Sequence, residues 1–396
     1  MEKTKIKTLV RQIRGVSYKP EDLHNELDDN SVVLLRANNI DEGKINFDDV
    51  VYVDKSKVSD EQYLKCGDIL ICASSGSKNL VGKAANIRFD MECTFGAFCK
   101  VVRPKEGFSD YLSVYFQSPI YRRKISEVAI GANINNIRNE HIDELDIPVF
   151  SNDEQASIVK KMYLIQEVIS NRKAELEKLD NLIKARFVEM FGDPQVNPFG
   201  WGVVNISEVV GGKVSNGFFA KRDDYVDDGN VSILGVANIV NRMYSKVDEL
   251  PKTNVDDKDI EKFEVRYGDM LFCRSSLVAE GIGKASIIPE NVQDNVLFEC
   301  HVIRLPLDLN KCVPEFMQTL STTDFFRNQV IAQSKTATMT TIGQDGILKT
   351  DIILPPVDKQ REFYDFVHQV DKSKVVYMCI HKKLGKQKKQ IKYKIA

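Results

Sequence analysis

The amino-acid sequence contains two copies of one pattern, and this repeat limits the folds that the chain can adopt. Residues 67–75 (GDILICASS) recur as residues 268–276 (GDMLFCRSS), 201 positions later. Further pairs follow in the same order at offsets of 199 to 207: Asn39-Ile40 with Asn238-Ile239, Gly82-Lys83-Ala84 with Gly283-Lys284-Ala285, Ile147-Pro148 with Leu354-Pro355, and Gln155 with Gln360. Loop insertions produce small drifts of this kind. The sequence therefore indicates a tandem duplication of about half of the chain.

Each half has the same predicted plan, a mixed α/β region followed by a long helix. Short apolar runs between turn residues predict strands at 32–35, 68–72, 231–234 and 269–273. Each region closes at a proline, Pro148 or Pro355, where a strand or helix stops. We expect globular domains over 1–150 and 193–357, and helical spacers over 151–192 and 358–396.

Both helical segments carry an alternating 3-4 spacing of apolar residues, which is typical of coiled coils. The first ladder is Ile158, Met162, Ile165, Ile169, Arg172, Leu176, Leu179, Ile183, Arg186 and Met190. The second is Phe363, Val367, Val370, Lys374, Tyr377, His381, Leu384, Lys388, Ile391 and Ile395. Because the two ladders begin in the same register after Gln155 and Gln360, we expect them to pack on each other. The alternative is two separate amphipathic helices, each lying on its own domain.

The ends of the two helices are predicted differently. Gly192 and Pro194 end the first, since glycine stops a helix and proline forbids its resumption. The second is rich in lysine from Lys372 onward, contains no acidic residue there, and includes Gly385, which costs ~1 kcal/mol relative to alanine. A helix of ~36 residues is ~54 Å long. If the helices run antiparallel, the two globular domains, or heads, are related by a pseudo-two-fold axis. The expected fold class is α+β, with two tandem mixed α/β domains separated by an antiparallel coiled coil.

Several of these features resemble one family. Ile147, Pro148, Glu154 and Gln155, the Gly-Asp-Ile-Leu stretch at 67–70 with its copy at 268–271, and the junction Met190-Phe191-Gly192-Asp193-Pro194 with Asn197-Pro198 and Gly200-Trp201 are similar to the DNA-specificity subunits of type I restriction–modification systems. The stretch Arg14-Gly15-Val16-Ser17-Tyr18 also resembles the start of the family's first domain. The second copy departs from the pattern, since Lys359 stands in place of the glutamate. The lysine-rich, glycine-containing second helix is another departure.

The resemblance implies two target-recognition domains and no catalysis by this chain. It implies that the partners are double-stranded DNA, two modification subunits and restriction subunits. The modification subunits would methylate adenine with S-adenosylmethionine, and the restriction subunits would translocate and cut DNA with ATP. The helices would set the spacing of the heads and dock the modification subunits. Along B-DNA ~54 Å corresponds to ~16 base pairs, so two heads held at this distance would read a split target. Because the two heads differ in sequence, the two half-sites would also differ.

The residues themselves also argue against an enzyme. Asn197-Pro198-Phe199 lacks the second proline of an amino-methyltransferase loop, and Gly82-Lys83-Ala84 lacks the spacing and the hydroxyl of a P-loop. The eight cysteines and five histidines show no zinc-site spacing, so we expect reduced thiols, no metal and no bound cofactor. We find neither a run of ~18 apolar residues nor a signal peptide, and we expect a cytoplasmic location without membrane attachment.

The formal net charge of −2, from 55 Lys+Arg and 57 Asp+Glu, does not by itself favour DNA, since nucleic-acid-binding domains are usually basic. The charge is, however, a sum over two heads, two helices and partner surfaces, and partners can neutralise phosphate. We therefore expect the chain alone to bind DNA weakly and the assembled complex to bind it tightly.

The candidate DNA contacts are polar and basic loop residues, because Arg and Lys read guanine, Asn and Gln read adenine, and hydroxyls contact phosphate. In the first head they are Ser75, Ser77, Lys78, Asn79, Lys83, Arg88, Asn133, Asn135, Asn136 and Arg138. In the second head they are Lys221, Arg222, Arg274, Ser275, Ser276, Lys284, Lys335, Thr336, Thr338 and Thr340. The alternative for any one of them is a turn or capping role. The alternative function is a two-headed coiled-coil scaffold that joins protein partners without recognising DNA.

Overall fold

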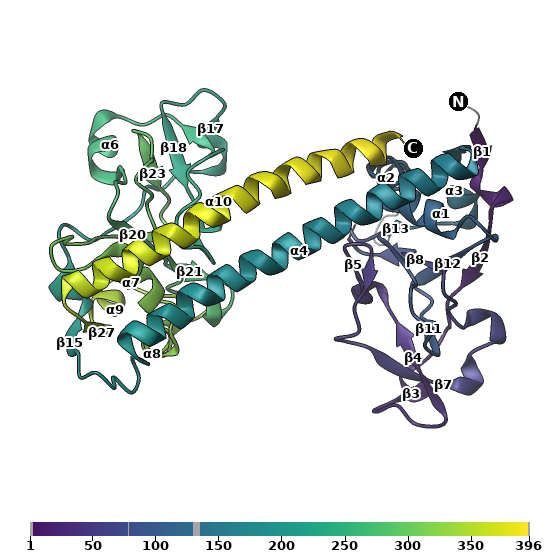
Figure 1. Cartoon of the computed structure of the whole chain (residues 1–396), viewed down its shortest axis with the longest axis horizontal. Coiled ribbons are helices and arrows are strands. Elements are labelled where there is room, and N and C mark those ends of the chain that lie inside the picture. Colours follow the sequence, from purple (N-terminus) through teal and green to yellow (C-terminus); the bar gives the residue numbers. More distant parts are fainter. Residues whose placement is uncertain (1–2, 78, 130–134, 395–396) are drawn as a thin grey trace. The chain divides into compact units, whose positions relative to one another are not determined.

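The computed structural model of the chain describes residues 3–77, 79–129 and 135–394 (Figure 1). The chain divides into two compact units. Unit 1 comprises Met1–Ala174 together with Met378–Ala396, and unit 2 comprises Glu175–Tyr377. Both long helices, α4 (Asn152–Phe191) and α10 (Val357–Lys394), contribute one part to each unit.

Unit 1 contains most of the first copy of the repeat. Its helices besides α4 and α10 are α1 (Ser109–Phe116), α2 (Pro119–Val128) and α3 (Asn139–Asp143). Its strands are β1 (Lys3–Lys5), β2 (Val10–Arg14), β3 (Leu23–His24), β4 (Ser31–Leu35), β5 (Ile40–Asp41), β6 (Lys44–Ile45), β7 (Val51–Asp54), β8 (Ile69–Cys72), β9 (Ser74–Ser75), β10 (Ala84–Asn86), β11 (Cys93–Phe95), β12 (Cys99–Pro104), β13 (Asn135–Asn136) and β14 (Asp146–Pro148).

Unit 2 contains the second copy. Its helices besides α4 and α10 are α5 (Val236–Ile239), α6 (Asp257–Phe263), α7 (Pro314–Leu320), α8 (Asp324–Ala332) and α9 (Gln344–Leu348). Its strands are β15 (Gly202–Asn205), β16 (Ser215–Asn216), β17 (Tyr225–Val226), β18 (Val231–Leu234), β19 (Lys252–Thr253), β20 (Asp269–Cys273), β21 (Ser275–Ser276), β22 (Ala285–Ile287), β23 (Val296–Phe298), β24 (Val302–Pro306), β25 (Lys335–Thr336), β26 (Thr340–Thr341) and β27 (Asp351–Leu354).

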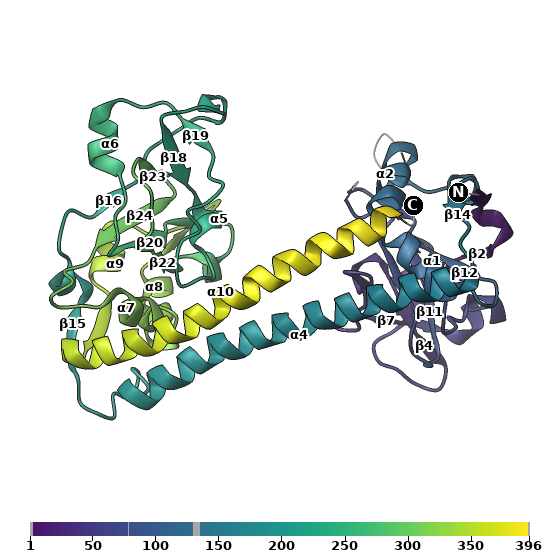
Figure 2. The same ribbon diagram turned by 45° about the horizontal axis from the view of Figure 1, so that its top comes forward.

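The two units repeat one sheet topology. The order β10-β8-β12-β2 in unit 1 corresponds to β22-β20-β24-β16 in unit 2, and β11-β4-β7-β3 corresponds to β23-β18-β19-β17. Even the one parallel pair of the second sheet recurs, as β4 with β11 and β18 with β23. In each unit α1–α3 or α7–α9 lie toward the long helices, whereas the second sheet lies away from them (Figures 1 and 2). The four predicted strands are β4, β8, β18 and β20, so the prediction of a duplicated mixed α/β fold is confirmed.

The repeated residues are structural. Asp68 and Asp269 are buried, and each accepts a hydrogen bond from the backbone N–H three residues upstream, at 2.8 and 2.9 Å. Gln155 and Gln360 begin the long helices, and the Nε2 atom of each donates to the carbonyl oxygen five residues upstream, both at 2.8 Å. Buried polar groups need such partners, so the repeat preserves the turns that hold the sheets and helix starts.

Two glycines of the framework allow close backbone approach. Val16 bridges to Gly96 in unit 1, and Phe218 bridges to Glu299 in unit 2. A Cβ at the preceding Gly15 would lie 2.2 Å from the Gly96 carbonyl oxygen, and one at Gly217 would lie 2.2 Å from the Phe298 carbonyl oxygen. No other residue fits at these two positions without moving backbone.

Local signals fix the ends of the long helices. Ser151 and Glu154 form a capping box, in which the Ser151 N–H donates to the Glu154 carboxylate at 3.0 Å and the Glu154 N–H donates to Ser151 Oγ at 3.4 Å. Gly192 follows the last helical residue of α4 in the left-handed conformation, with φ of 77°. The second helix continues through Gly385 to Lys394. Glycine therefore weakens α10 without ending it.

Inside unit 2 the end of α4 packs against the start of α10. The predicted rungs Ile183, Phe363, Val367 and Val370 are buried in one cluster, and Leu179 lies against it. Because Asp180 pairs with Lys374 while Phe187 contacts Phe363, the two segments run antiparallel here. The interpretation that the ladders face one another is confirmed within this unit.

One part of the ladder was predicted wrongly. Beyond Ile183 the completely buried side chains of α4 are Phe187 and Phe191. The predicted rungs Arg186 and Met190 are only half-buried. The end of α4 lies on the sheet and helices of a globular core, where the helical period of 3.6 applies in place of the 3.5 of a coiled coil.

In unit 1 the start of α4 and the end of α10 lie on the same core. Met162 is fully buried, and Ile158 and Ile391 pack against its cluster. The predicted rungs Ile165, Ile169 and Leu384 of this unit are half-buried, as are Leu176 and Tyr377 of unit 2. Lys392 also lies on this core, where its Nζ donates to the Gln117 carbonyl oxygen at 2.7 Å.

Candidate DNA interface

Each unit pairs its two candidate loops in a small sheet of its own. In unit 1 β9 runs antiparallel to β13, with Ser75 opposite Asn135. In unit 2 β21 runs antiparallel to β26, with Ser276 opposite Thr340, and β25 adds a third strand. In both units the paired segments are about 60 residues apart in the chain. The fold therefore brings together residues that the sequence could only propose separately.

In unit 1 the exposed candidates are side chains at the edge of this small sheet. They are Ser77, Asn79, Asn136 and Arg138, whereas Ser75 and Lys83 are half-buried. Ser74 Oγ donates to Asn136 Oδ1 at 2.8 Å, which fixes the amide. Asn135 is only 5% exposed and belongs to the interior. The candidates Lys78 and Asn133 lie outside the described residues.

Arg88 does not join this group. Its guanidinium donates to Asp110 Oδ1 at 2.8 Å and lies over the ring of Tyr163, 4.2 Å from the centroid. Tyr163 belongs to α4 and donates to the same carboxylate oxygen at 2.9 Å. Arg88 therefore holds α4 against unit 1, and its cationic group is already engaged.

In unit 2 the exposed candidates are Lys335, Thr336 and Thr338. Thr340 is buried, and its hydroxyl lies 3.0 Å from that of Thr336, so it stiffens the loop and does not face solvent. Three other candidates, Arg274, Ser275 and Ser276, are half-buried, and Arg274 donates to the Cys300 carbonyl oxygen at 3.2 Å.

The remaining candidates of unit 2 lie elsewhere. Lys221 is exposed and precedes a short turn, where its N–H donates to Asp224 Oδ2 at 2.7 Å. The side chain of Arg222 lies outside the described part of the chain. Lys284 is half-buried and donates from Nζ to Asn241 Oδ1 at 2.8 Å. These residues are not gathered in the sheet of β21, β25 and β26.

Two arginines that the sequence analysis missed hold the candidate loops. Arg122 of α2 donates to the carbonyl oxygens of Val81 and Asn79, the latter at 2.9 Å. Arg327 of α8 stands at the equivalent place and donates to the Glu280 carbonyl oxygen at 3.1 Å. Both lie against the glycine of the repeated Gly-Lys turn, Gly82 or Gly283. The signal was available, because the two arginines are 205 residues apart, as are Gln155 and Gln360.

Lys100 was missed as well, and it supports the segment that follows β13 in unit 1. It is 8% exposed, and its Nζ donates to the side chain of Asn139 and to the Ile137 carbonyl oxygen. Burial lowers the pKa of Lys100 to about 8. Its position just after Cys99 in an apolar strand gave no sequence signal for this contact.

The units differ most beside these loops. Unit 1 has a cavity of about 450 Å³ between its two sheets and β9, lined by Tyr18, Arg36, Asn38, Ser74 and Phe98 among others. Gly96 also lines this cavity, and in unit 2 the equivalent residue is Glu299. The Glu299 carboxylate accepts a hydrogen bond from the Val236 N–H at 2.7 Å. At equivalent places the shared framework therefore carries a glycine beside a cavity in unit 1 and a carboxylate in unit 2.

Two further properties concern the described residues only. Among residues 3–77, 79–129 and 135–394, no three His, Cys, Asp or Glu side chains are placed to hold a metal ion. Within the same ranges no helix has the length and apolar character needed to cross a membrane.

Two units that share a framework and differ in their polar loops define a class of tandem recognition proteins. No family model matches the chain. It is 33% identical over 382 residues to the type I restriction enzyme StySPI specificity subunit of Salmonella potsdam, covering 92% of this chain and 81% of the relative. It is 30% identical over 385 residues, with the same coverage, to the EcoKI specificity subunit of Escherichia coli strain K12. The chain belongs to the family of type I restriction enzyme specificity subunits.

Solved structures share the fold. The S subunit of the type I restriction–modification system from M. genitalium aligns with a TM-score of 0.54 at 13% identity, covering 99% of this chain and 94% of that one. A chain from a structure of type I system assembly and conformational transition aligns with a TM-score of 0.51 at 15% identity, covering 99% and 96%. As a specificity subunit, the chain is a non-catalytic component of a type I restriction–modification system.

Proposed function

We propose that this specificity subunit reads a split, asymmetric DNA target, with each unit recognising one half. The observation that carries the proposal is the pairing of equivalent loops in both units, β9 with β13 and β21 with β26, on one repeated framework. The framework residues match, whereas the exposed side chains differ. Asn79, Asn136 and Arg138 are among the exposed candidates of unit 1, whereas those of unit 2 are Lys335, Thr336 and Thr338. Different donors and acceptors favour different base edges.

The long helices are proposed to act as the spacer between the half-sites and as the docking surface for two modification subunits. The antiparallel contact between Asp180 and Lys374 in unit 2 supports a coiled coil along the whole spacer. Leu164, Val168, Leu182 and Val188 of α4 are apolar and exposed, as a docking helix requires. Restriction subunits complete the proposed complex.

The proposal assigns all chemistry to the partners. S-adenosylmethionine would be held by the modification subunits and ATP by the restriction subunits, with neither bound by this chain. The chain's own contribution is orientation, because its units fix which adenines the partners can reach. The balanced charge supports a division of labour in which partners supply part of the phosphate contacts.

Methylome sequencing tests the proposed function. A host with the gene and the same host without it are compared, and one split methylated motif is expected to disappear on deletion. Purified complex should bind a duplex carrying that motif tightly at physiological salt, and the isolated chain should bind it weakly. An unchanged methylome, or tight specific binding by the isolated chain, would contradict the proposal.

The alternative is a two-headed scaffold that joins protein partners. It predicts that partners copurify while methylation and DNA binding do not depend on this chain. Exchanging the candidate loops separates the two functions, because a scaffold without DNA recognition would leave the sequence of the methylated motif unaltered.

A further inference from the structure

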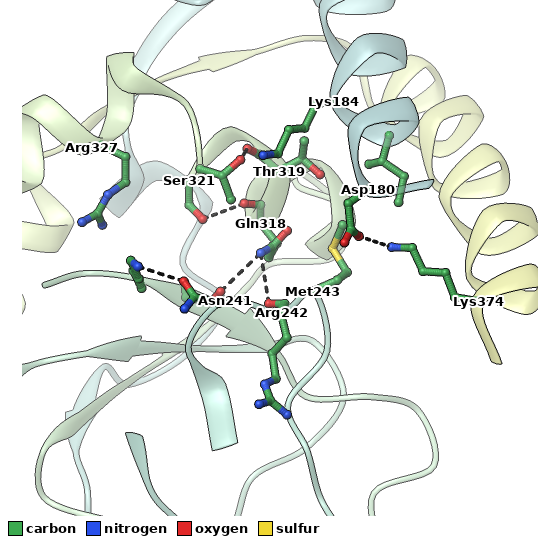
Figure 3. Close-up of a pocket in the computed structure, with 14 residues that line it drawn as sticks. Asp180, Lys184, Asn241, Arg242, Met243, Gln318, Thr319, Ser321, Arg327 and Lys374 are labelled. Atoms are coloured by element: carbon green, nitrogen blue, oxygen red, sulfur yellow. Dashed lines mark hydrogen bonds and ion pairs between the residues drawn. The ribbon is translucent and has the colours of Figure 1, made fainter. Parts of the chain in front are cut away.

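A basic cleft opens in unit 2 beside the candidate loops. It has a volume of about 360 Å³ and lies between the last turns of α4, the middle of α10, the turn at 241–243 and α7–α8 (Figure 3). Five cationic side chains line it: Lys184, Arg242, Lys284, Arg327 and Lys374. The one carboxylate in its lining is Asp180, and that group is already paired with Lys374. The cleft therefore has a strong excess of positive charge.

Three of these cations, Lys184, Lys284 and Arg327, have no carboxylate partner among the described residues. Lys184 is exposed, and Lys284 bonds only the neutral amide of Asn241. Arg327 donates from Nη2 to a carbonyl oxygen, while its Nη1 is buried without an acceptor. Burial lowers the pKa of Arg327. An anion entering the cleft would be attracted by these cationic groups, which no described carboxylate neutralises.

The neutral polar groups of the cleft are satisfied from within. Gln318 donates from Nε2 to the carbonyl oxygens of Arg242 and Ala285, at 3.2 and 3.3 Å. Ser321 donates to the Gln318 carbonyl oxygen at 2.6 Å, and Thr322 to that of Thr319 at 2.7 Å. Apart from the amide Nδ2 of Asn241, the donors left for a ligand are thus cationic. Such a site suits phosphate, which is bound by charge, better than a base edge, which needs a directional pattern of donors and acceptors.

One hairpin connects the cleft with the candidate interface of unit 2. Ser276 and Lys284 belong to one hairpin between β20 and β22, and Arg327 bonds Glu280 within that hairpin. The phosphate backbone of a duplex bound on β21 and β26 would pass beside this hairpin. In unit 1 the equivalent Arg122 uses both terminal nitrogens on loop carbonyls, so that unit lacks the spare donor.

We infer that this cleft binds backbone phosphate of DNA and anchors unit 2 without regard to sequence. The inference rests on the proposed function of DNA recognition and adds to it a site that reads charge only. The site would contribute affinity and register, whereas the loops of β21, β25 and β26 would contribute sequence preference.

The test compares three forms of the full chain assembled with its modification subunits. They are the wild type, Lys184→Gln/Lys284→Gln in the cleft, and Lys213→Gln/Lys258→Gln, which removes two exposed lysines outside the cleft. Affinity is measured against salt concentration for a target duplex and for a scrambled one of ~40 base pairs. Each lost phosphate contact should reduce the slope of log K against log salt by about 1, so the cleft variant should lose about 2 and the control none.

The outcomes separate this inference from the proposed function. Equal weakening on both duplexes, with the ratio of target to scrambled affinity unchanged and recovery in Lys184→Arg/Lys284→Arg, supports the cleft. An unchanged slope overturns it, and a changed ratio overturns it by showing base reading. Loss of the modification subunits from the cleft variant without DNA also overturns it, because the cleft then takes acidic protein side chains. A wild-type complex with no preference for the target contradicts the proposed function itself.

Discussion

Phe187 of α4 packs edge-on against Phe363 of α10, with ring centroids 5.6 Å apart and ring planes inclined by 78°. Both side chains are completely buried, and Phe191 and Phe316 complete the aromatic group. Phe187→Ala leaves a cavity in a core that cannot close over it. We expect the free energy of unfolding of unit 2 to fall by about 3–5 kcal/mol, measured by denaturant titration.

The adjacent Val188 gives the matched control, because it is an exposed residue on the same helical turn. Val188→Ala should change the free energy of unfolding by about 0.5 kcal/mol or less. Similar losses in the two variants would contradict the helix packing described for unit 2.

Gly217 tests the repeated framework. A Cβ there would meet the carbonyl oxygens of Phe298 and Glu299 at 2.2 and 2.3 Å, so Gly217→Ala must push two backbone segments apart. We expect unit 2 to lose about 2 kcal/mol or more. Gly202 has open space around its Cβ position, and Gly202→Ala should be nearly neutral. A thermal scan of both variants is sufficient, and equal midpoints would refute the close approach.

Glu315 makes the stability of unit 2 depend on pH. Its carboxyl is 1% exposed and accepts from Tyr244 Oη at 3.1 Å, and its Oε2 has no partner among the described residues. Burial, with smaller contributions from the charges of Glu290 and Asp371, raises the pKa of Glu315 from 4.5 to about 7. Between pH 4.5 and 7 Glu315 is therefore protonated in the folded form and ionised in the unfolded form. The free energy of unfolding of unit 2 falls as pH rises through that window.

The isosteric neutral variant Glu315→Gln removes this dependence. At pH 8 it should be more stable than the wild type by about 1–3 kcal/mol, and at pH 4 the two should agree closely. Free energies of unfolding at the two pH values provide the measurement. A variant that is less stable than the wild type at pH 8 would show that the ionised carboxylate is well accommodated.

Lys392 makes the contact of α10 with unit 1 depend on pH in the opposite sense. Burial, together with the charge of Lys388, lowers the pKa of Lys392 from 10.5 to about 8. Between pH 8 and 10.5 Lys392 is protonated when the end of α10 is released and neutral when that end is packed on unit 1. The contact therefore strengthens as pH rises from 8 to 10.5. Relative to the variant Lys392→Met, the wild type should become steadily better protected from chymotrypsin at Tyr393 across this range. A constant ratio of cleavage rates would exclude the effect.

The sequence predicted the framework well because the framework is what the duplication preserves. The pairs Asp68 with Asp269 and Gln155 with Gln360 sit in equivalent turns, and the strands at 32–35 and 231–234 have equivalent partners. The coiled-coil spacing predicted the packing of Phe363 and Val367 but failed beyond Ile183, where a globular core takes over.

The candidate site was predicted less completely, for a physical reason. Composition selects loop residues that could touch DNA, but it does not show which are already engaged. Arg88 is held by Asp110, and Thr340 and Asn135 are buried. The cleft of Lys184 and Arg327 combines residues from a spacer helix and a short helix of the domain, and no local pattern joins them.

The central claim is that each unit reads its own half of the target, and one loop exchange tests it most directly. Residues 333–341, which include Lys335, Thr336 and Thr338, are replaced by a loop of different sequence, and the methylome of cells carrying the altered gene is sequenced. We expect one half of the split motif to change or relax while the other half and the spacing stay the same. Loss of both halves together, or an unaltered motif, would contradict the account.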